Sequence, residues 1–323
     1  MSYAAWAMSA GSNAEALAAT AILIVGAPRS GTTWLAKIFD SHPDTIYRHE
    51  PDEIVPARDS IQTSMAVWAR QHDARTAGKR PFFAKSWQSP PARWAHAALA
   101  YAAAAAPRIG LPAFFIPDLG AIEQARLVVK SVRLSAKIGA FAEACPDGRA
   151  IFILRHPCGQ VASVMRGNRD GRFDLAESGT DMPFDEVGAI DYAARFGVDE
   201  PAFQRLPDAA KYAWSWRAYN EPAIAAMAGR ANARVVIYEE LCARPTEEIG
   251  RLLTFVGLDS APQLKTFLGR SAHHDGESGY YAVVRNSIAA AERWKTTMPA
   301  ADRAAVRAVV RGSELCRYWA DLQ

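Results

Sequence analysis

A glycine-bounded loop between an apolar run and a helical pattern constrains the fold of this chain most strongly. The run Ile22–Val25 favours a buried strand, and the residues from Thr32 onward favour a helix. The loop between them reads G-A-P-R-S-G and is bounded by Gly26 and Gly31. Such a turn points successive backbone N–H groups and the positive end of the helix toward one place. The stretch therefore predicts a phosphate-binding loop in an α/β protein.

The loop differs from the nucleoside-triphosphate loop at a decisive position. Thr32 and Thr33 follow Gly31 where the triphosphate motif has lysine and then serine or threonine. A cation occurs inside the loop instead, at Arg29, whose guanidinium can make paired hydrogen bonds to phosphate or sulfate oxygens. This pattern indicates an anion site of a different kind. The plainer interpretation is an ordinary strand-to-helix turn that carries a surface arginine.

The composition is that of a globular protein. The chain has 323 residues, of which 50% are hydrophobic, so it can bury a full core. Its net charge of +3 gives no strong positive potential to attract nucleic acid or an anionic membrane. Its four cysteines form no C-x-x-C pair, which argues against a zinc site and a disulfide framework. Residues 1–20 resemble neither a signal peptide nor a membrane anchor. We expect a cytoplasmic single domain over 1–323, without a metal or a membrane span, and the oligomeric state stays open.

Apolar strand patterns alternate with helical ones along much of the chain. After the first unit, strands are expected at 45–47, 126–130, 150–154 and 234–238. This alternation predicts a P-loop-like three-layer α/β sandwich, with a central parallel sheet flanked by helices. The alternation is lost at 54–125, which is rich in alanine and aromatics, and at 167–207, which is interpreted as a mobile loop or lid. A helix over 208–227 follows, with an interruption expected near Pro222.

Charged side chains stand where the expected strands end. His49 and Glu50 follow the strand after the loop, Lys130 ends the next strand, and Arg155 ends the one after that. Ligands of open α/β sheets gather at this edge. The helix after Arg155 places Ser163 roughly 8 to 9 Å along its axis, within the reach of an extended arginine. Two anion sites on one edge suggest a nucleotide with phosphates on both sides of its ribose.

Two motifs resemble those of the sulfotransferases that use 3′-phosphoadenosine 5′-phosphosulfate (PAPS). The run G-A-P-R-S-G-T-T-W-L resembles their 5′-phosphosulfate loop, and I-F-I-L-R-H-P-C-G-Q-V-A-S-V-M-R, about 125 residues later, resembles their 3′-phosphate motif. The run S-H-P-D-T-I-Y-R-H-E-P is similar to the carbohydrate and tyrosylprotein branch. The resemblance covers most of the chain except 54–125 and 167–207, which are expected to form the acceptor side.

The resemblance implies roles for individual residues. Glu50 occupies the position of the base that takes the acceptor proton, and His49 is the alternative base. Adjacent residues of a strand point to opposite faces, so only one of the two should face the sulfur. Lys130 and Arg29 are the cations expected at the sulfuryl group. The positions expected to bind the cofactor are Arg29, Ser30, Gly31, Thr32, Thr33, Trp34, Arg155, Ser163, Arg285, Asn286 and Ser287.

The function implied is the transfer of a sulfuryl group from PAPS, in line, to a hydroxyl of a carbohydrate, lipid or other small molecule. Cytosolic small-molecule sulfotransferases use a histidine in a K-T-H-type motif, and the nearest counterpart here, Lys85-Ser86-Trp87, has tryptophan in that place. One alternative is a P-loop small-molecule kinase that uses ATP, which the missing lysine disfavours. Another is a PAPS-binding protein without catalysis, which Glu50 and Lys130 disfavour.

Overall fold

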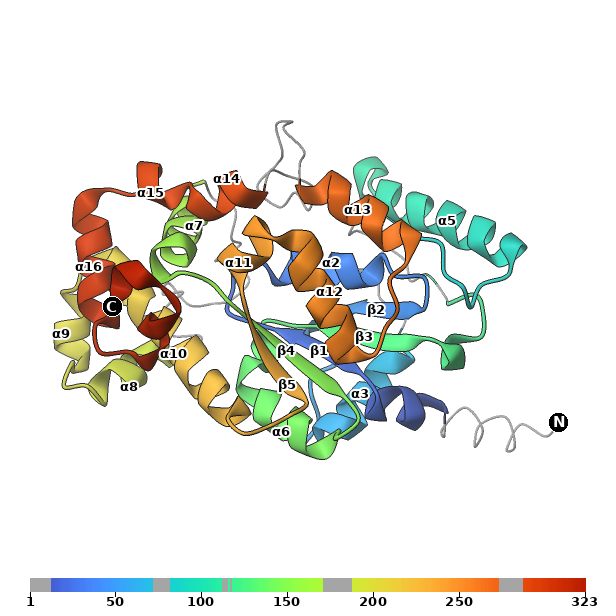
Figure 1. Ribbon diagram of the computed structural model, residues 1–323, viewed down its shortest axis with the longest axis horizontal. Coiled ribbons are helices and arrows are strands. Elements are labelled where there is room, and N and C mark those ends of the chain that lie inside the picture. Colours follow the sequence, from blue (N-terminus) through green and yellow to red (C-terminus); the bar gives the residue numbers. More distant parts are fainter. Residues whose placement is uncertain (1–12, 72–81, 112–115, 117, 171–187, 273–286) are drawn as a thin grey trace.

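A five-stranded parallel sheet in the order β2-β3-β1-β4-β5 forms the centre of this protein (Figure 1). The computed structural model describes residues 13–71, 82–111, 116, 118–170, 188–272 and 287–323. The strands are β1 (Ile22–Val25), β2 (Thr45–His49), β3 (Arg126–Lys130), β4 (Arg149–Leu154) and β5 (Ala233–Ile237). The predicted α/β sandwich with a central parallel sheet is confirmed.

Both faces of the sheet are covered, which explains why its strands read as unbroken apolar runs. Leu23 and Val25 of β1 enter one core, and Ile22 and Ile24 enter a second core on the opposite face. Helices that cover the first face include α3 (Ile61–Ala69), α6 (Ile138–Ala144) and α10 (Asp208–Met227). Those over the second face include α2 (Thr32–Asp40), α12 (Pro245–Val256) and α13 (Pro262–Ala272).

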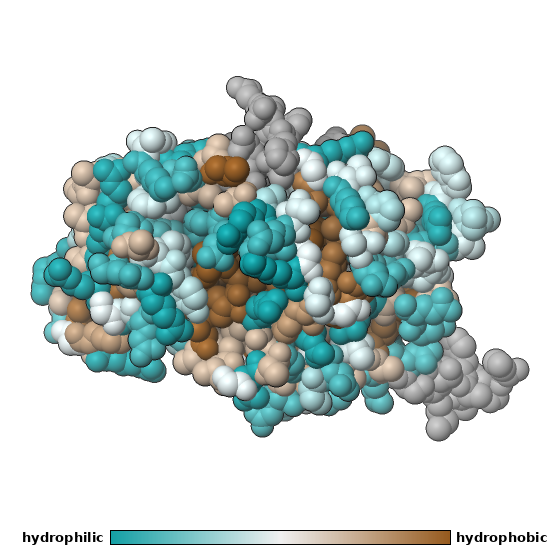
Figure 2. All heavy atoms as spheres, viewed as in Figure 1, coloured by the Kyte–Doolittle hydropathy of each residue, from teal (hydrophilic) through white to brown (hydrophobic). Residues whose placement is uncertain are grey.

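The remaining helices lie outside the two layers that cover the sheet (Figure 1). Figure 1 shows a group of helices beyond the carboxyl ends of β4 and β5: α7 (Pro157–Arg169), α11 (Tyr238–Ala243), α14 (Ser287–Glu292), α15 (Trp294–Thr297) and α16 (Ala300–Val310). Helix α16 packs on α10 and α7. Helix α5 (Pro90–Ala105) lies at the opposite side of this view, at the right of Figure 1. Figure 2 shows polar side chains over most of this face, with apolar patches between α10 and α12 and between α12 and α13. Among the described residues, no helix is both long and apolar enough to span a bilayer.

The segment at 167–207 contains more regular structure than its sequence predicts. Its described part holds α8 (Ala189–Ala194) and α9 (Glu200–Gln204). The Asp199 side chain accepts a hydrogen bond from the Ala202 N–H at 2.8 Å and so caps α9. The prediction of a loop is wrong here, because helices of five or six residues are too short to show a helical period.

Helix α10 runs without a break through Pro222, so the predicted interruption is also wrong. A proline inside a helix costs about 3 kcal/mol because it removes a hydrogen bond and crowds the preceding turn. Trp214 and Trp216 on this helix are buried, as are Ala223 and Ile224 just after the proline. Burial on both sides of Pro222 offsets that cost and keeps the helix continuous.

Candidate functional site

The loop at 26–31 joins the carboxyl end of β1 to the first turn of α2. Arg29 and Gly31 both adopt left-handed backbone conformations, with φ of 69° and 104°. A Cβ on Gly26 would lie 2.5 Å from the carbonyl oxygen of Ile153, and one on Gly31 would lie 2.5 Å from the Tyr238 ring. Only glycine fits at these two positions. The backbone therefore turns tightly against β4 and leaves the amino end of α2 directed into the loop, where backbone N–H groups favour an anion.

Two buried polar atoms beside the loop have no hydrogen-bond partner among the described residues. They are Ser30 Oγ, on a residue with no exposed surface, and Nε of Arg155. A buried donor left unsatisfied costs about 1 to 3 kcal/mol, so native structures rarely leave one without a reason. Ser30 Oγ can donate to an anion at the loop, and Arg155 Nε, which lies against Gly159, can donate to an anion beside α7. The residues present therefore fit bound phosphate or sulfate groups.

The two motifs that are far apart in sequence lie together at this point. Nη1 of Arg155 donates to the carbonyl oxygen of Arg29 at 2.9 Å, and Nη2 donates to the carbonyl oxygen of Ala290 at 3.1 Å. Nε of Arg29 donates to Ser163 Oγ at 3.4 Å. The Arg155 guanidinium also lies over the Tyr238 ring, 4.6 Å from its centre. Arg29 thus reaches from the loop to the residues of the second motif.

Glu50 and Lys130 form an ion pair where β2 and β3 end. Lys130 Nζ donates to Glu50 Oε1, and the backbone N–H of Glu50 donates to the Lys130 carbonyl oxygen at 2.6 Å. Lys130 lies opposite Ile24 of β1 in the sheet register, which places the pair at the same edge as the loop. Glu50 has a φ of 47°, a left-handed conformation that costs a residue other than glycine about 1 kcal/mol or more. Strain of this kind gathers at functional sites.

Burial and neighbouring charges shift the pKa values of two groups at this edge, Lys130 and Asp52. Burial lowers the pKa of Lys130, Glu50 opposes that shift, and the Arg29 guanidinium adds to it. Burial raises the pKa of Asp52, partly offset by a hydrogen bond from Ser131. Two cations that destabilise each other's charge would be relieved by an anion between them. Among the residues described, no three His, Cys, Asp or Glu side chains are grouped as a metal site would require.

The side chains of His49 and Glu50 lie close together, although adjacent strand residues were expected to point to opposite faces. Its Nε2 is 3.8 Å from Glu50 Oε2, and its Nδ1 is 2.7 Å from the Tyr47 hydroxyl. The alternation argument does not hold for this pair, because β2 ends at His49 and Glu50 has already left the extended conformation. Tyr47 was not among the predicted site residues, although alternation along β2 places it on the same face as His49.

The first turn of α2 carries the other predicted loop residues. Thr32 and Trp34 are buried and Thr33 is half-buried. The indole N–H of Trp34 donates to Ser271 Oγ at 3.1 Å, and its ring packs edge-on against Tyr238. The Trp34 side chain therefore packs between the loop and α13.

The predicted contacts near the carboxyl end are only partly covered by the structure. Arg285 and Asn286 lie outside the described residues, and Ser287 is the first residue of α14. Tyr238 belongs to the site and was missed. It directly follows β5, so its position at a strand end is the sequence signal that could have identified it.

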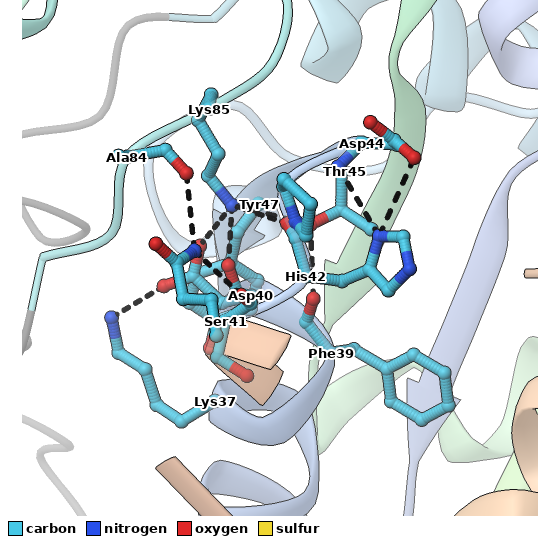
Figure 3. Close-up of polar contacts among 12 residues, drawn as sticks. Lys37, Phe39, Asp40, Ser41, His42, Asp44, Thr45, Tyr47, Ala84 and Lys85 are labelled. Carbon is cyan, nitrogen blue, oxygen red and sulfur yellow. Dashed lines mark hydrogen bonds and ion pairs between the residues drawn. The ribbon is translucent and has the colours of Figure 1, made fainter. Parts of the chain in front are cut away.

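Lys85 lies away from the loop, at the carboxyl end of α2 (Figure 3). Its Nζ donates to the carbonyl oxygen of Asp40, to Asp40 Oδ1 at 3.1 Å and to Thr45 Oγ1 at 3.2 Å, while Lys37 holds Asp40 Oδ2 at 2.7 Å. Burial alone would raise the pKa of Asp40, but the two lysines lower it. Burial lowers the pKa of Lys85. The nine residues of α2 span about 13 Å, so this lysine cluster is structural and separate from the loop.

Comparison with known proteins gives a family match and several structural likenesses. The Sulfotransferase family matches residues 21–262, and no curated protein matches. The chain is similar to the sulfotransferase domain from the Synechococcus PCC 7002 olefin synthase, at 16% identity over 90% of this chain and 93% of that one, with a TM-score of 0.44. It is also similar to mouse sulfotransferase SULT7A1 complexed with PAP, at 14% identity over 92% and 86% of the chains, with a TM-score of 0.44.

Proposed function

This chain belongs to the sulfotransferase family, and we propose that it transfers the sulfuryl group of PAPS to a hydroxyl group of a carbohydrate, lipid or other small molecule. The observation that carries the proposal is the contact of Arg29 with both Ser163 and Arg155. It joins the loop and the second basic motif into one anion-binding edge. Such an edge suits a nucleotide with an anionic group on each side of its ribose.

The residues divide between the two ends of the donor. The loop N–H groups, Ser30 Oγ and Arg29 are proposed to bind the 5′-phosphosulfate. Arg155 and Ser163 are proposed to bind the 3′-phosphate. The unsatisfied Ser30 Oγ and Arg155 Nε support this division, since each can donate one more hydrogen bond.

Glu50 and Lys130 are proposed to carry the chemistry at the sulfuryl group. PAPS supplies that group when it is bound. Glu50 takes the proton of the acceptor hydroxyl while the hydroxyl oxygen forms a bond to sulfur. The bond between sulfur and the 5′-phosphate oxygen breaks, and its electron pair stays on that oxygen. Lys130 neutralises the charge that develops there. The ion pair of Glu50 and Lys130 keeps both groups at this edge before the reaction.

Calorimetric titration with product-like nucleotides tests the donor site. We expect the protein to bind adenosine 3′,5′-bisphosphate at least about tenfold more tightly than adenosine 5′-phosphate, because charge-assisted hydrogen bonds to the second phosphate contribute about 1.5 to 3 kcal/mol each. Tight binding of ATP–Mg²⁺ together with no binding of the bisphosphate would reject the proposal and favour a kinase.

A further inference from the structure

The side chains of Tyr47 and His49 lie in a line that leads to Glu50, the proposed base. The Tyr47 hydroxyl lies 2.7 Å from His49 Nδ1, and His49 Nε2 lies 3.8 Å from Glu50 Oε2. Tyr47 and His49 are each 3% exposed, so water competes little for these groups. The imidazole therefore stands between the phenol and the carboxylate, with one ring nitrogen toward each.

We propose that Tyr47 is a positioning residue, whose hydroxyl donates a hydrogen bond to Nδ1 of His49 and so fixes the imidazole proton on Nε2, facing Glu50. The proposal rests on the proposed function, in which Glu50 is the base. A neutral imidazole has one donor and one acceptor nitrogen. With its proton on Nε2, His49 cannot accept the acceptor's proton at that atom. His49 supports the carboxylate, and Glu50 alone is left to act as the base.

The charges around the three residues favour this tautomer. The Glu50 carboxylate offers only acceptor atoms, so it stabilises an N–H on the nearer nitrogen, Nε2. Nδ1 is then the nitrogen without a proton, and the Tyr47 hydroxyl at 2.7 Å can donate to it. The protons therefore point in one direction, from Tyr47 toward His49 and from His49 toward Glu50.

With its proton on Nε2, His49 can act as a hydrogen-bond donor to Glu50. At 3.8 Å its Nε2–H is short of a hydrogen bond to Glu50, whose other oxygen is held by Lys130. A small shift of the carboxylate, or one bridging water, would complete the contact with His49 and keep Glu50 oriented toward the acceptor.

Nitrogen NMR of the whole protein, without nucleotide or acceptor, tests the tautomer directly. In ¹⁵N-histidine-labelled protein, the His49 signals are identified by their loss in His49→Gln. We expect a proton on Nε2 in the wild type and a loss of this preference in Tyr47→Phe. The matched control is Tyr101→Phe, which removes a hydroxyl from a ring that is 57% exposed on α5 and should leave the His49 signals unchanged. A proton on Nδ1 of wild-type His49, or an unchanged Tyr47→Phe spectrum, overturns the proposal.

Kinetics then test the consequence for the reaction. Transfer from ³⁵S-labelled PAPS should fall about tenfold in Tyr47→Phe, the effect of one lost hydrogen bond, while the affinity for adenosine 3′,5′-bisphosphate is unchanged. Full turnover in Tyr47→Phe with an altered tautomer would reject the positioning role. If the wild type binds no bisphosphate and transfers no sulfuryl group, the proposed function fails, whereas the NMR spectrum still decides the tautomer.

Discussion

Arg155 links the loop at 26–31 to residues that lie far from it in the sequence. Its two terminal nitrogens hold carbonyl oxygens of the loop and of α14, and its face lies over the Tyr238 ring. Nε is the donor that remains unsatisfied among the described residues. A planar guanidinium can donate in several directions and stack on a ring at the same time, and an ammonium group cannot.

Arg155→Lys should therefore weaken donor binding although the charge is kept. We expect the affinity for adenosine 3′,5′-bisphosphate to fall by about ten- to a hundredfold, because at least one charge-assisted hydrogen bond and the backbone contacts are lost. Titration calorimetry measures this change. Arg244→Lys, at a half-exposed position on the surface, is the matched control and should bind normally. Equal affinities of the two variants would remove Arg155 from the binding edge.

At the scale of elements, the tight junction between the loop and α2 depends on Gly31. Gly31→Ala combines a left-handed backbone with a clash against the Tyr238 ring. We expect it to lower the free energy of unfolding by about 2 kcal/mol or more and to weaken bisphosphate binding. Gly229→Ala has a similar positive φ of 73° but open space around the added methyl group, and should cost only about 1 kcal/mol. Urea unfolding compares the two, and equal losses would contradict the packing argument.

The cluster of Lys37, Asp40 and Lys85 stabilises the far end of the same helix. Lys85→Met removes donors to the Asp40 carboxylate and to the Asp40 carbonyl oxygen at the end of α2, so we expect a loss of about 2 kcal/mol in unfolding free energy. Bisphosphate affinity should not change, because the cluster lies at the opposite end of α2 from the loop. A large loss of affinity in a folded Lys85→Met protein would contradict this separation and place Lys85 at the donor site.

The elements that were predictable are those whose pattern is local. Helix α2 begins at Thr32, as expected from sequence, since a glycine-bounded loop marks its start. The joint edge of Glu50 and Lys130 was predictable from parallel strand ends. The reach of Arg29 to Ser163 was not, because it depends on side-chain directions across the sheet. The continuity of α10 through Pro222 likewise depends on tertiary packing.

At the scale of the whole molecule, a buried histidine couples stability to pH. Burial lowers the pKa of His156 to about 4, against the opposing effect of Asp321. His156 accepts a hydrogen bond from the Cys158 N–H at the start of α7 and stacks on Trp294 at 4.4 Å. The neutral imidazole is therefore built into the junction of α7 with the carboxyl-terminal helices.

Stability should fall as the solution becomes more acidic. The folded protein keeps His156 neutral between about pH 6.5 and 4, whereas the unfolded chain takes up a proton there, so the free energy of unfolding drops by about 3 kcal/mol across this window. Urea unfolding from pH 8 to 4 measures this loss. His156→Asn keeps a capping side chain but does not titrate, and should show a shallower pH dependence. Identical slopes for the two proteins would contradict the assignment.

The chain as a whole brings the loop at 26–31, a second basic motif and an ion pair of Glu50 with Lys130 to one sheet edge. The most direct test is transfer of ³⁵S from labelled PAPS to a panel of hydroxyl acceptors, made of N-acetylglucosamine, 2-naphthol and cholesterol, by the wild type and Glu50→Gln. We expect transfer by the wild type and a loss of at least about a hundredfold in Glu50→Gln, with bisphosphate affinity kept. Glu53→Gln, a neighbouring carboxylate, should retain full turnover. Equal turnover of Glu50→Gln and the wild type would contradict the account.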